Sequence, residues 1–217
     1  MDRMSNTPST RSVKISDDER GGWSSDRPRP GGGPARPINV SGKCRILPPT
    51  DRMRYSPGSL LVIVSGSEQA REKFADRLID DRASLLSLAK VRGLLAGRVE
   101  EDVLEERAVQ LLDAAINKRL AVSETVVVVA DSVDPAERDR YIRLAFAVKR
   151  PRHLIFLEAG KDELSGDDAS LVNDLRRSFD AGEVGQEGFQ TAMRLGGATI
   201  PELKRIVFRP PPPKDDA

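Results

Sequence analysis

The sequence contains one cysteine and one histidine among its 217 residues. Because a disulfide needs two cysteines, Cys44 cannot form an intrachain bridge, and we expect a free thiol in a reducing compartment. A zinc site of the usual kind needs several Cys or His ligands, so we predict no metal site. The single histidine, His153, precedes the apolar run LIFLEA, and we expect a structural role for it at a strand edge.

Aromatic residues and long apolar runs are also scarce. Aromatics make up 4% of the chain, so its core must be built from Val, Leu, Ile and Ala. No apolar stretch approaches the roughly 20 residues that span a bilayer, and the polar N-terminal segment does not resemble a signal peptide. We therefore expect no membrane contact and a cytoplasmic location.

The chain has almost no net charge, since 35 Lys and Arg are balanced by 34 Asp and Glu. This balance gives no argument for nucleic acid as a partner. The charges are unevenly distributed, however: residues 1–57 contain 11 Lys or Arg and 6 Asp or Glu, a local net charge of +5.

The same N-terminal stretch is rich in Pro and Gly, with 14 of them in residues 1–57. Such a composition cannot bury enough apolar surface to fold. We predict a basic, disordered or extended arm over 1–56, a folded domain over 57–209 and a tail over 210–217. Within the arm, residues 38–49 carry two short apolar clusters that could add a strand to the domain.

Beyond residue 57, buried strand patterns alternate with helical patterns. The runs LLVIV at 60–64, VVVV within 124–132 and LIFL after His153 are apolar on both faces, as in a parallel sheet covered by helices. Asp134 and Pro135 form a typical helix start. We predict an α/β fold with a mainly parallel sheet, in which 60–64 and 125–129 are adjacent central strands.

The junction VIVSGSEQAREKF, residues 62–74, runs from a strand through a Ser-Gly-Ser turn into a helix. It resembles the phosphate-loop region of P-loop kinases of the polynucleotide-kinase type, a group often labelled AAA family ATPase. In these kinases the motif G-x-x-x-x-G-K-[ST] binds ATP phosphates and Mg²⁺. The resemblance aligns the first glycine with Ser65 or Gly66, the last glycine with Ala70, the lysine with Arg71, and the Ser/Thr with Glu72.

Further resemblances follow in order along the chain. In LAKVRGLLAG, Ala89 takes the place of the aspartate that prepares the substrate hydroxyl, and Arg92 takes that of the arginine three residues later. Val129 replaces the aspartate at the end of the family's Asp-Ala-Thr-Asn strand. NDLRRSF, with Arg176 and Arg177, resembles the arginine-bearing lid, and EGFQTAMRL resembles the segment before the last strand.

The resemblance implies a P-loop NTPase-like three-layer sandwich, but the residues at the chemical positions have changed. Glu72 would place a carboxylate beside the phosphates, and like charges near 4 Å repel by about 4 kcal/mol at an effective dielectric of 20. Without a carboxylate at Ala89 the family's general base is missing. We expect no catalytic residues and no cofactor, with ATP and Mg²⁺ bound only if the altered loop still functions.

Three functions remain open. We expect a catalytically inactive kinase-like domain that binds a protein partner through its arm or surface. The alternatives are a divergent protein that binds nucleotides or nucleic-acid ends, and an active kinase with an atypical loop. The candidate nucleotide-binding residues are Gly66, Ser67 and Arg71, and the candidate phosphate or lid arginines are Arg92, Arg176 and Arg177.

The junction also has a purely structural interpretation. In it, Gly66 and Ser67 form an ordinary strand-to-helix turn and Ser67 caps the helix. Arg71 and Glu72 are then solvated side chains.

Overall fold

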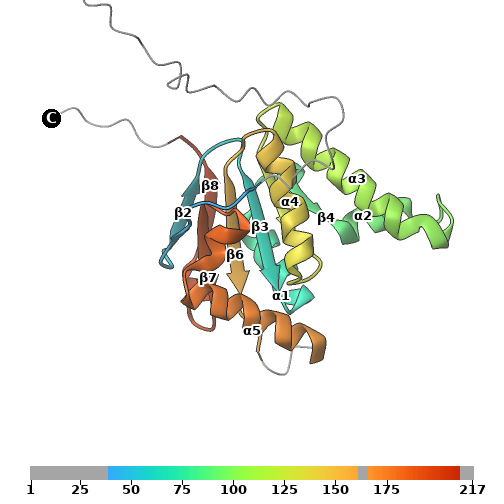
Figure 1. Cartoon of the computed structure of the whole chain (residues 1–217). Coiled ribbons are helices and arrows are strands. Elements are labelled where there is room, and N and C mark those ends of the chain that lie inside the picture. The colour runs from blue at the N-terminus through green and yellow to red at the C-terminus, as the bar shows by residue number, and fades with distance from the viewer. Residues whose placement is uncertain (1–38, 161–165, 211–217) are drawn as a thin grey trace, which may run out of the picture. The chain divides into compact units, whose positions relative to one another are not determined.

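The computed structural model describes residues 39–160 and 166–210 (Figure 1). Residues 1–38 of the predicted arm and residues 211–217 of the predicted tail lie outside these residues. None of the helices in the described ranges is long and apolar enough to cross a lipid bilayer. In chain order the elements are β1 (Arg45–Ile46), β2 (Arg52–Tyr55), β3 (Leu60–Ser65), α1 (Glu68–Leu78), η2 (Arg82–Ser84), β4 (Leu85–Ser87), α2 (Leu88–Leu95), α3 (Glu101–Ala121), β5 (Val126–Val129), α4 (Pro135–Ala147), β6 (Arg152–Leu157), α5 (Gly166–Asp180), η4 (Glu183–Glu187), β7 (Thr191–Leu195), α6 (Thr199–Glu202) and β8 (Arg205–Phe208).

Six strands form one sheet in the order β1-β7-β6-β3-β5-β4, and every neighbouring pair is parallel. The prediction that 60–64 and 125–129 are adjacent central strands is confirmed, because β3 pairs with β5 on one side and with β6 on the other. The prediction of an α/β fold with a mainly parallel sheet is confirmed as well.

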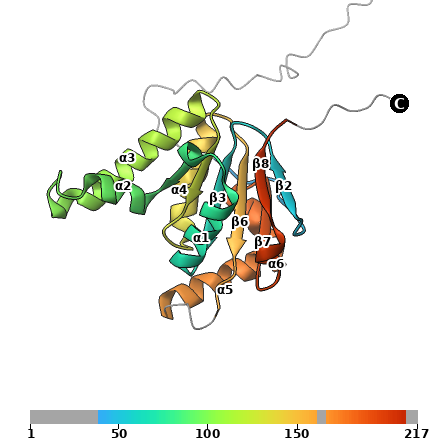
Figure 2. The same ribbon diagram turned by 180° about the vertical axis from the view of Figure 1, so that it is seen from behind.

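Alternate residues of β3 enter two separate cores. Leu60, Val62 and Val64 pack with residues of α3, α4 and α5 on one face. Leu61 and Ile63 pack on the opposite face, which is covered by α1 and by a second, two-stranded parallel sheet of β2 and β8. Figures 1 and 2 show these layers from opposite sides. We call the β2–β8 pair the ribbon.

Local sequence signals explain where the helices next to the central strands begin. The Ser67 hydroxyl accepts a hydrogen bond from the N–H of Ala70, so Ser67 caps α1 as predicted. Asp134 caps α4 in the same manner, with Pro135 in the first turn. Both helices therefore begin directly after a central strand.

The crossovers define where a ligand crevice lies in such a sheet. The chain leaves β3 through α1 over one face, whereas it leaves β5 and β6 through α4 and α5 over the other. Open α/β sheets bind ligands at such a point, outside the carboxyl ends of the strands. We call residues 65–67 and 130–133, which follow β3 and β5, the crevice.

The predicted domain boundary at residue 57 is wrong. β1 pairs with β7 and β2 pairs with β8, so residues 39–56 belong to the folded domain. The apolar side chains of Met53 and Tyr55 are buried against the sheet, which holds β2 in place. The segment 38–49, which the sequence suggested could add a strand to the domain, does add one, the two-residue β1.

The single cysteine and the single histidine of the sequence are both at least partly buried in the fold. Cys44 is a free, half-buried thiol, and burial raises its pKa. His153 is buried within β6, where its Nδ1 lies 2.8 Å from the hydroxyl oxygen of Thr191 on β7. Its ring stacks on that of Tyr55 with 4.5 Å between centroids.

Candidate functional site

The turn at the start of the crevice is short. β3 ends at Ser65 and α1 begins at Glu68, so only Gly66 and Ser67 separate strand from helix. The N–H of Ser67 donates to the Ser65 hydroxyl, so the turn uses part of its hydrogen-bonding capacity internally. A phosphate cradle instead needs several N–H groups that converge on one point. Ala70 and Arg71 lie in the first turns of α1 and not in a loop.

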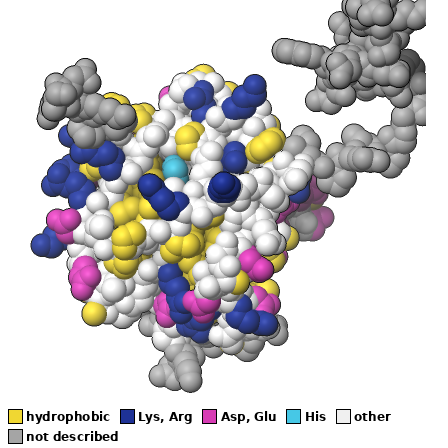
Figure 3. Space-filling view, turned by 60° about the vertical axis from the view of Figure 1, so that its left-hand side comes forward, with side chains coloured by type: hydrophobic (Ala, Val, Ile, Leu, Met, Phe, Trp, Pro, Cys, Tyr) yellow, Lys and Arg dark blue, Asp and Glu magenta, His cyan; other side chains and the backbone are white. Residues whose placement is uncertain are grey.

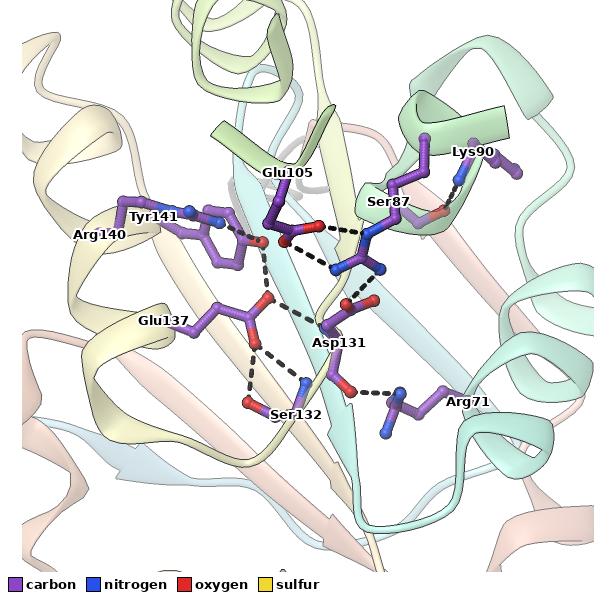
Figure 4. Close-up of polar contacts among 10 residues, drawn as sticks. Arg71, Ser87, Lys90, Glu105, Asp131, Ser132, Glu137, Arg140 and Tyr141 are labelled. Atoms are coloured by element: carbon purple, nitrogen blue, oxygen red, sulfur yellow. Dashed lines mark hydrogen bonds and ion pairs between the residues drawn. The ribbon is translucent and has the colours of Figure 1, made fainter. Parts of the chain in front are cut away.

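Arg71 occupies the crevice itself. Its side chain turns back from α1, and the residue is only 5% exposed. Nη1 donates to the carbonyl oxygen of Ser65 and Nη2 to that of Asp131, both at 2.5 Å. Figure 4 shows the guanidinium beside the chain that follows β5. The interpretation that Arg71 is solvated is therefore wrong, whereas Glu72 is exposed as it predicts.

The surroundings of the Arg71 guanidinium are electronegative. Burial lowers its pKa, and the carboxylates that oppose this shift are those of Asp131, Glu68, Glu137 and Asp168. Arginine nevertheless keeps its charge in proteins. The crevice thus holds a cation whose Nη1 and Nη2 already donate to carbonyl oxygens of the chain itself.

Arg92 is the second predicted arginine at this place. It forms a two-pronged ion pair with Glu105 of α3, at 2.7 and 2.8 Å, and its Nη1 lies 2.6 Å from the Asp131 carboxylate. The hydrogen bond to Glu105 is the largest cause that raises the pKa of Arg92, and the same bond lowers the pKa of Glu105. Asp131 therefore joins Arg71 through its carbonyl and Arg92 through its carboxylate.

The backbone donors after β5 are taken by Glu137, a residue that the sequence reasoning missed. Its carboxylate accepts hydrogen bonds from the N–H groups of Asp131 and Ser132, both at 2.9 Å, and from the hydroxyls of Ser132 and Tyr141. The signal was present in Asp134-Pro135-Ala136-Glu137, because a glutamate three residues after an N-cap commonly reaches back to backbone N–H groups. An internal anion fills the place where an external one could bind.

The remaining predicted arginines are only partly brought to this region. Arg176 of α5 lies 3.4 Å from a carboxylate oxygen of Glu158, just after β6, and donates to Asn173. Arg177 pairs with Asp174 of the same helix, and its side chain is 79% exposed. Arg71 and Arg92 thus meet at Asp131, whereas Arg177 points to solvent.

The positions aligned with catalytic carboxylates carry apolar side chains in the structure. Val129 is buried at the end of β5, and Ala89 lies half-buried in α2. Glu72 lines a cavity of about 210 Å³ together with Val129 and Lys90. Across residues 39–160 and 166–210, no group of three or more His, Cys, Asp or Glu could hold a metal ion.

No protein-family model and no curated protein matches this chain. That Gly66, Ser67 and Arg71 contact a nucleotide stays a prediction.

Proposed function

We propose that residues 39–210 form a P-loop kinase-like domain, of the polynucleotide-kinase type, that transfers no phosphoryl group and serves as a protein-interaction scaffold. The observation that carries this proposal is the buried guanidinium of Arg71 in the crevice, bonded to the carbonyl oxygens of Ser65 and Asp131. The strand order supports it. The crossovers from β3 and β5 run over opposite faces of the sheet, which places the usual ligand crevice of an α/β sheet where Arg71 lies.

Nucleotide binding at the crevice would carry two costs. Arg71 would have to give up two hydrogen bonds from a charged group, each worth about 1.5–3 kcal/mol. The incoming phosphates would then lie beside the carboxylates of Asp131 and Glu137, where like charges repel. The missing carboxylate at Ala89 removes a base for phosphoryl transfer even if a nucleotide entered.

The scaffold part of the proposal draws on the exposed surface of α2 and α3. Leu94 is 61% and Leu111 is 45% exposed, so each presents apolar area to solvent. The alternative, a nucleotide-binding protein that uses its arginines, gains less support because Arg92 and Arg176 already contact carboxylates.

Titration of labelled ATP with Mg²⁺ tests the proposal on wild type, Arg71→Ala and Glu72→Ser. We expect no saturation with wild type up to about 1 mM ATP. Arg71→Ala should remain without tight binding, because the carboxylates still face the crevice. Arg107→Ala, an exposed position on α3, is the control for loss of one arginine. Micromolar binding by wild type that Arg71→Ala abolishes would contradict the proposal.

A further inference from the structure

The ribbon presents arginines on the side that faces away from the core. Alternate residues point inward, where Met53, Tyr55 and Ile206 are 6%, 4% and 3% exposed. The other positions of β2 and β8 carry exposed Arg52, Arg54 and Arg205, the half-buried Val207 and, directly after β8, the exposed Arg209. Arg209 continues the pairing, since its N–H donates to the carbonyl of Tyr55.

These positive charges lie close together. In the parallel register Arg52 is directly opposite Arg205. Neighbouring strands are about 4.8 Å apart and alternate residues about 6.6 Å apart along a strand, so the four arginines form a compact array. Like charges directly opposite each other on a sheet are destabilising. The array therefore costs stability in the isolated domain.

Within the described residues, little compensates this charge. Arg205 pairs with Asp80 at 2.7 Å, and this is the only ion pair that the four arginines make there. The Arg54 side chain donates to a backbone carbonyl, that of Pro210. Figure 3 brings the ribbon side forward and shows Lys and Arg side chains at the upper left, the top and the centre of that face, with several Asp and Glu at the left margin and lower down. Asp80, Asp81 and Glu124 share a cavity with Arg205 and Arg209, so compensation is confined to the β8 side, and the array keeps an excess of positive charge.

We propose that the outer face of the ribbon binds the phosphodiester backbone of double-stranded DNA. The planar guanidinium donates two parallel hydrogen bonds to phosphate oxygens, which a lysine cannot do. A phosphate backbone needs only such ionic contacts, whereas the residues that dominate a protein interface cluster at its centre in well-packed pockets that exclude water. The outward positions offer only Val207 as an apolar side chain.

The same positions favour a duplex over a single strand. Proteins that bind single strands combine cations with aromatic side chains on which the bases stack. The aromatic residues of the ribbon, Tyr55 and Phe208, instead lie against each other with their centroids 5.9 Å apart, and Tyr55 is buried. The ribbon and the crevice have no residue in common, so this inference does not rest on the proposed function.

Fluorescence anisotropy with a labelled duplex of about 20 base pairs tests the proposal on the full chain. Four phosphate contacts predict that affinity falls about a hundredfold between 50 and 200 mM salt. The triple variant Arg52→Gln/Arg54→Gln/Arg209→Gln keeps the Arg205–Asp80 pair and should bind at least tenfold more weakly at 50 mM salt. Its slope of log affinity against log salt should be lower by about 2 to 3.

A charge-matched control distinguishes this face from a general charge effect. Arg98→Gln/Arg107→Gln/Lys118→Gln removes the same charge from exposed positions near and on α3 and should change affinity less than threefold. Equal thermal melting of both variants would verify that the ribbon still forms. The proposal is overturned if wild type does not bind the duplex, if the two triple variants bind equally, or if single-stranded DNA, duplex RNA or poly-glutamate binds more tightly than the DNA duplex.

Discussion

Arginines meet opposite conditions in two regions of this domain. In the crevice, Arg71 and Arg92 are surrounded by carbonyl and carboxylate oxygens of the chain itself. On the ribbon, Arg52 faces Arg205 across the pairing, and only Arg205 has a carboxylate partner within the described residues. A cation that the fold already neutralises supports structure, whereas one left uncompensated is available to a ligand. The position of an arginine in the fold therefore says more about its role than the number of arginines in the chain does.

The strongest test of this contrast compares Arg71→Ala with Arg52→Ala. Loss of Arg71 removes two charged hydrogen bonds from buried carbonyls and leaves a void, so we expect a loss of about 3–5 kcal/mol in unfolding free energy. Arg52→Ala should change it by less than about 0.5 kcal/mol. Urea denaturation followed by circular dichroism measures both. Similar losses in the two variants would contradict the contrast.

Acid should weaken the contact between the ribbon and the main sheet through His153. Burial, and secondarily the charge of Arg152, lowers the pKa of His153 to about 4 from the ordinary value of 6.5. Between these values the unfolded chain binds a proton that the folded chain does not, so stability falls as pH falls from 6.5 to 4. The expected contribution is about 3 kcal/mol.

His153→Gln isolates this contribution because its side chain does not titrate. Unfolding free energies at pH 7 and pH 4.5 should differ less in the variant than in wild type. An equal difference in both proteins would show that carboxylates alone cause the acid sensitivity.

A substitution at the margin of the crevice should change the unfolding free energy less. Glu105→Gln weakens the two-pronged pair with Arg92 but leaves the contact with Asp131. Because the Glu105 side chain is 59% exposed, we expect a loss of only about 0.5–1 kcal/mol in unfolding free energy. Melting curves of variant and wild type at low and high salt check this prediction. Because salt screens the pair, the difference in melting temperature should be smaller at high salt.

The smallest predicted change in unfolding free energy is an increase in stability. Arg52→Glu on the ribbon places a carboxylate opposite Arg205 and should stabilise the domain by up to about 0.5 kcal/mol. The same change should weaken duplex binding, so stability and binding would move in opposite directions. Destabilisation by more than about 1 kcal/mol would mean that Arg52 has a structural role.

Strands and helix starts could be predicted because their signals are local. The continuous apolar runs of β3, β5 and β6 and the caps Ser67 and Asp134 each lie within a few residues of the element that they define. β7 was harder to recognise as a strand, because Thr191 and Arg194 interrupt its apolar pattern. The pairing of β2 with β8 joins segments from opposite ends of the domain, and no local pattern in either segment identifies its partner.

The crevice could be located from the sequence but its contents could not. Strand-turn-helix order placed Gly66 and Ser67 correctly. Whether Arg71 faces solvent or turns back depends on the carbonyl of Asp131, which the adjacent strand brings near through the fold. Glu137 shows the same limit, because its capping pattern was visible but its bond to the N–H of Asp131 was not.

The ribbon also sets an order of events during protein synthesis. β2 is made early, but among the described residues its pairing partner β8 is the last strand to leave the ribosome. Until Phe208 has emerged, β2 lacks its partner strand, and non-local pairing of this kind forms late in folding. A nascent chain that already contains the six-stranded sheet would therefore still lack the complete arginine array, and the surface that we propose for DNA would appear only with β8.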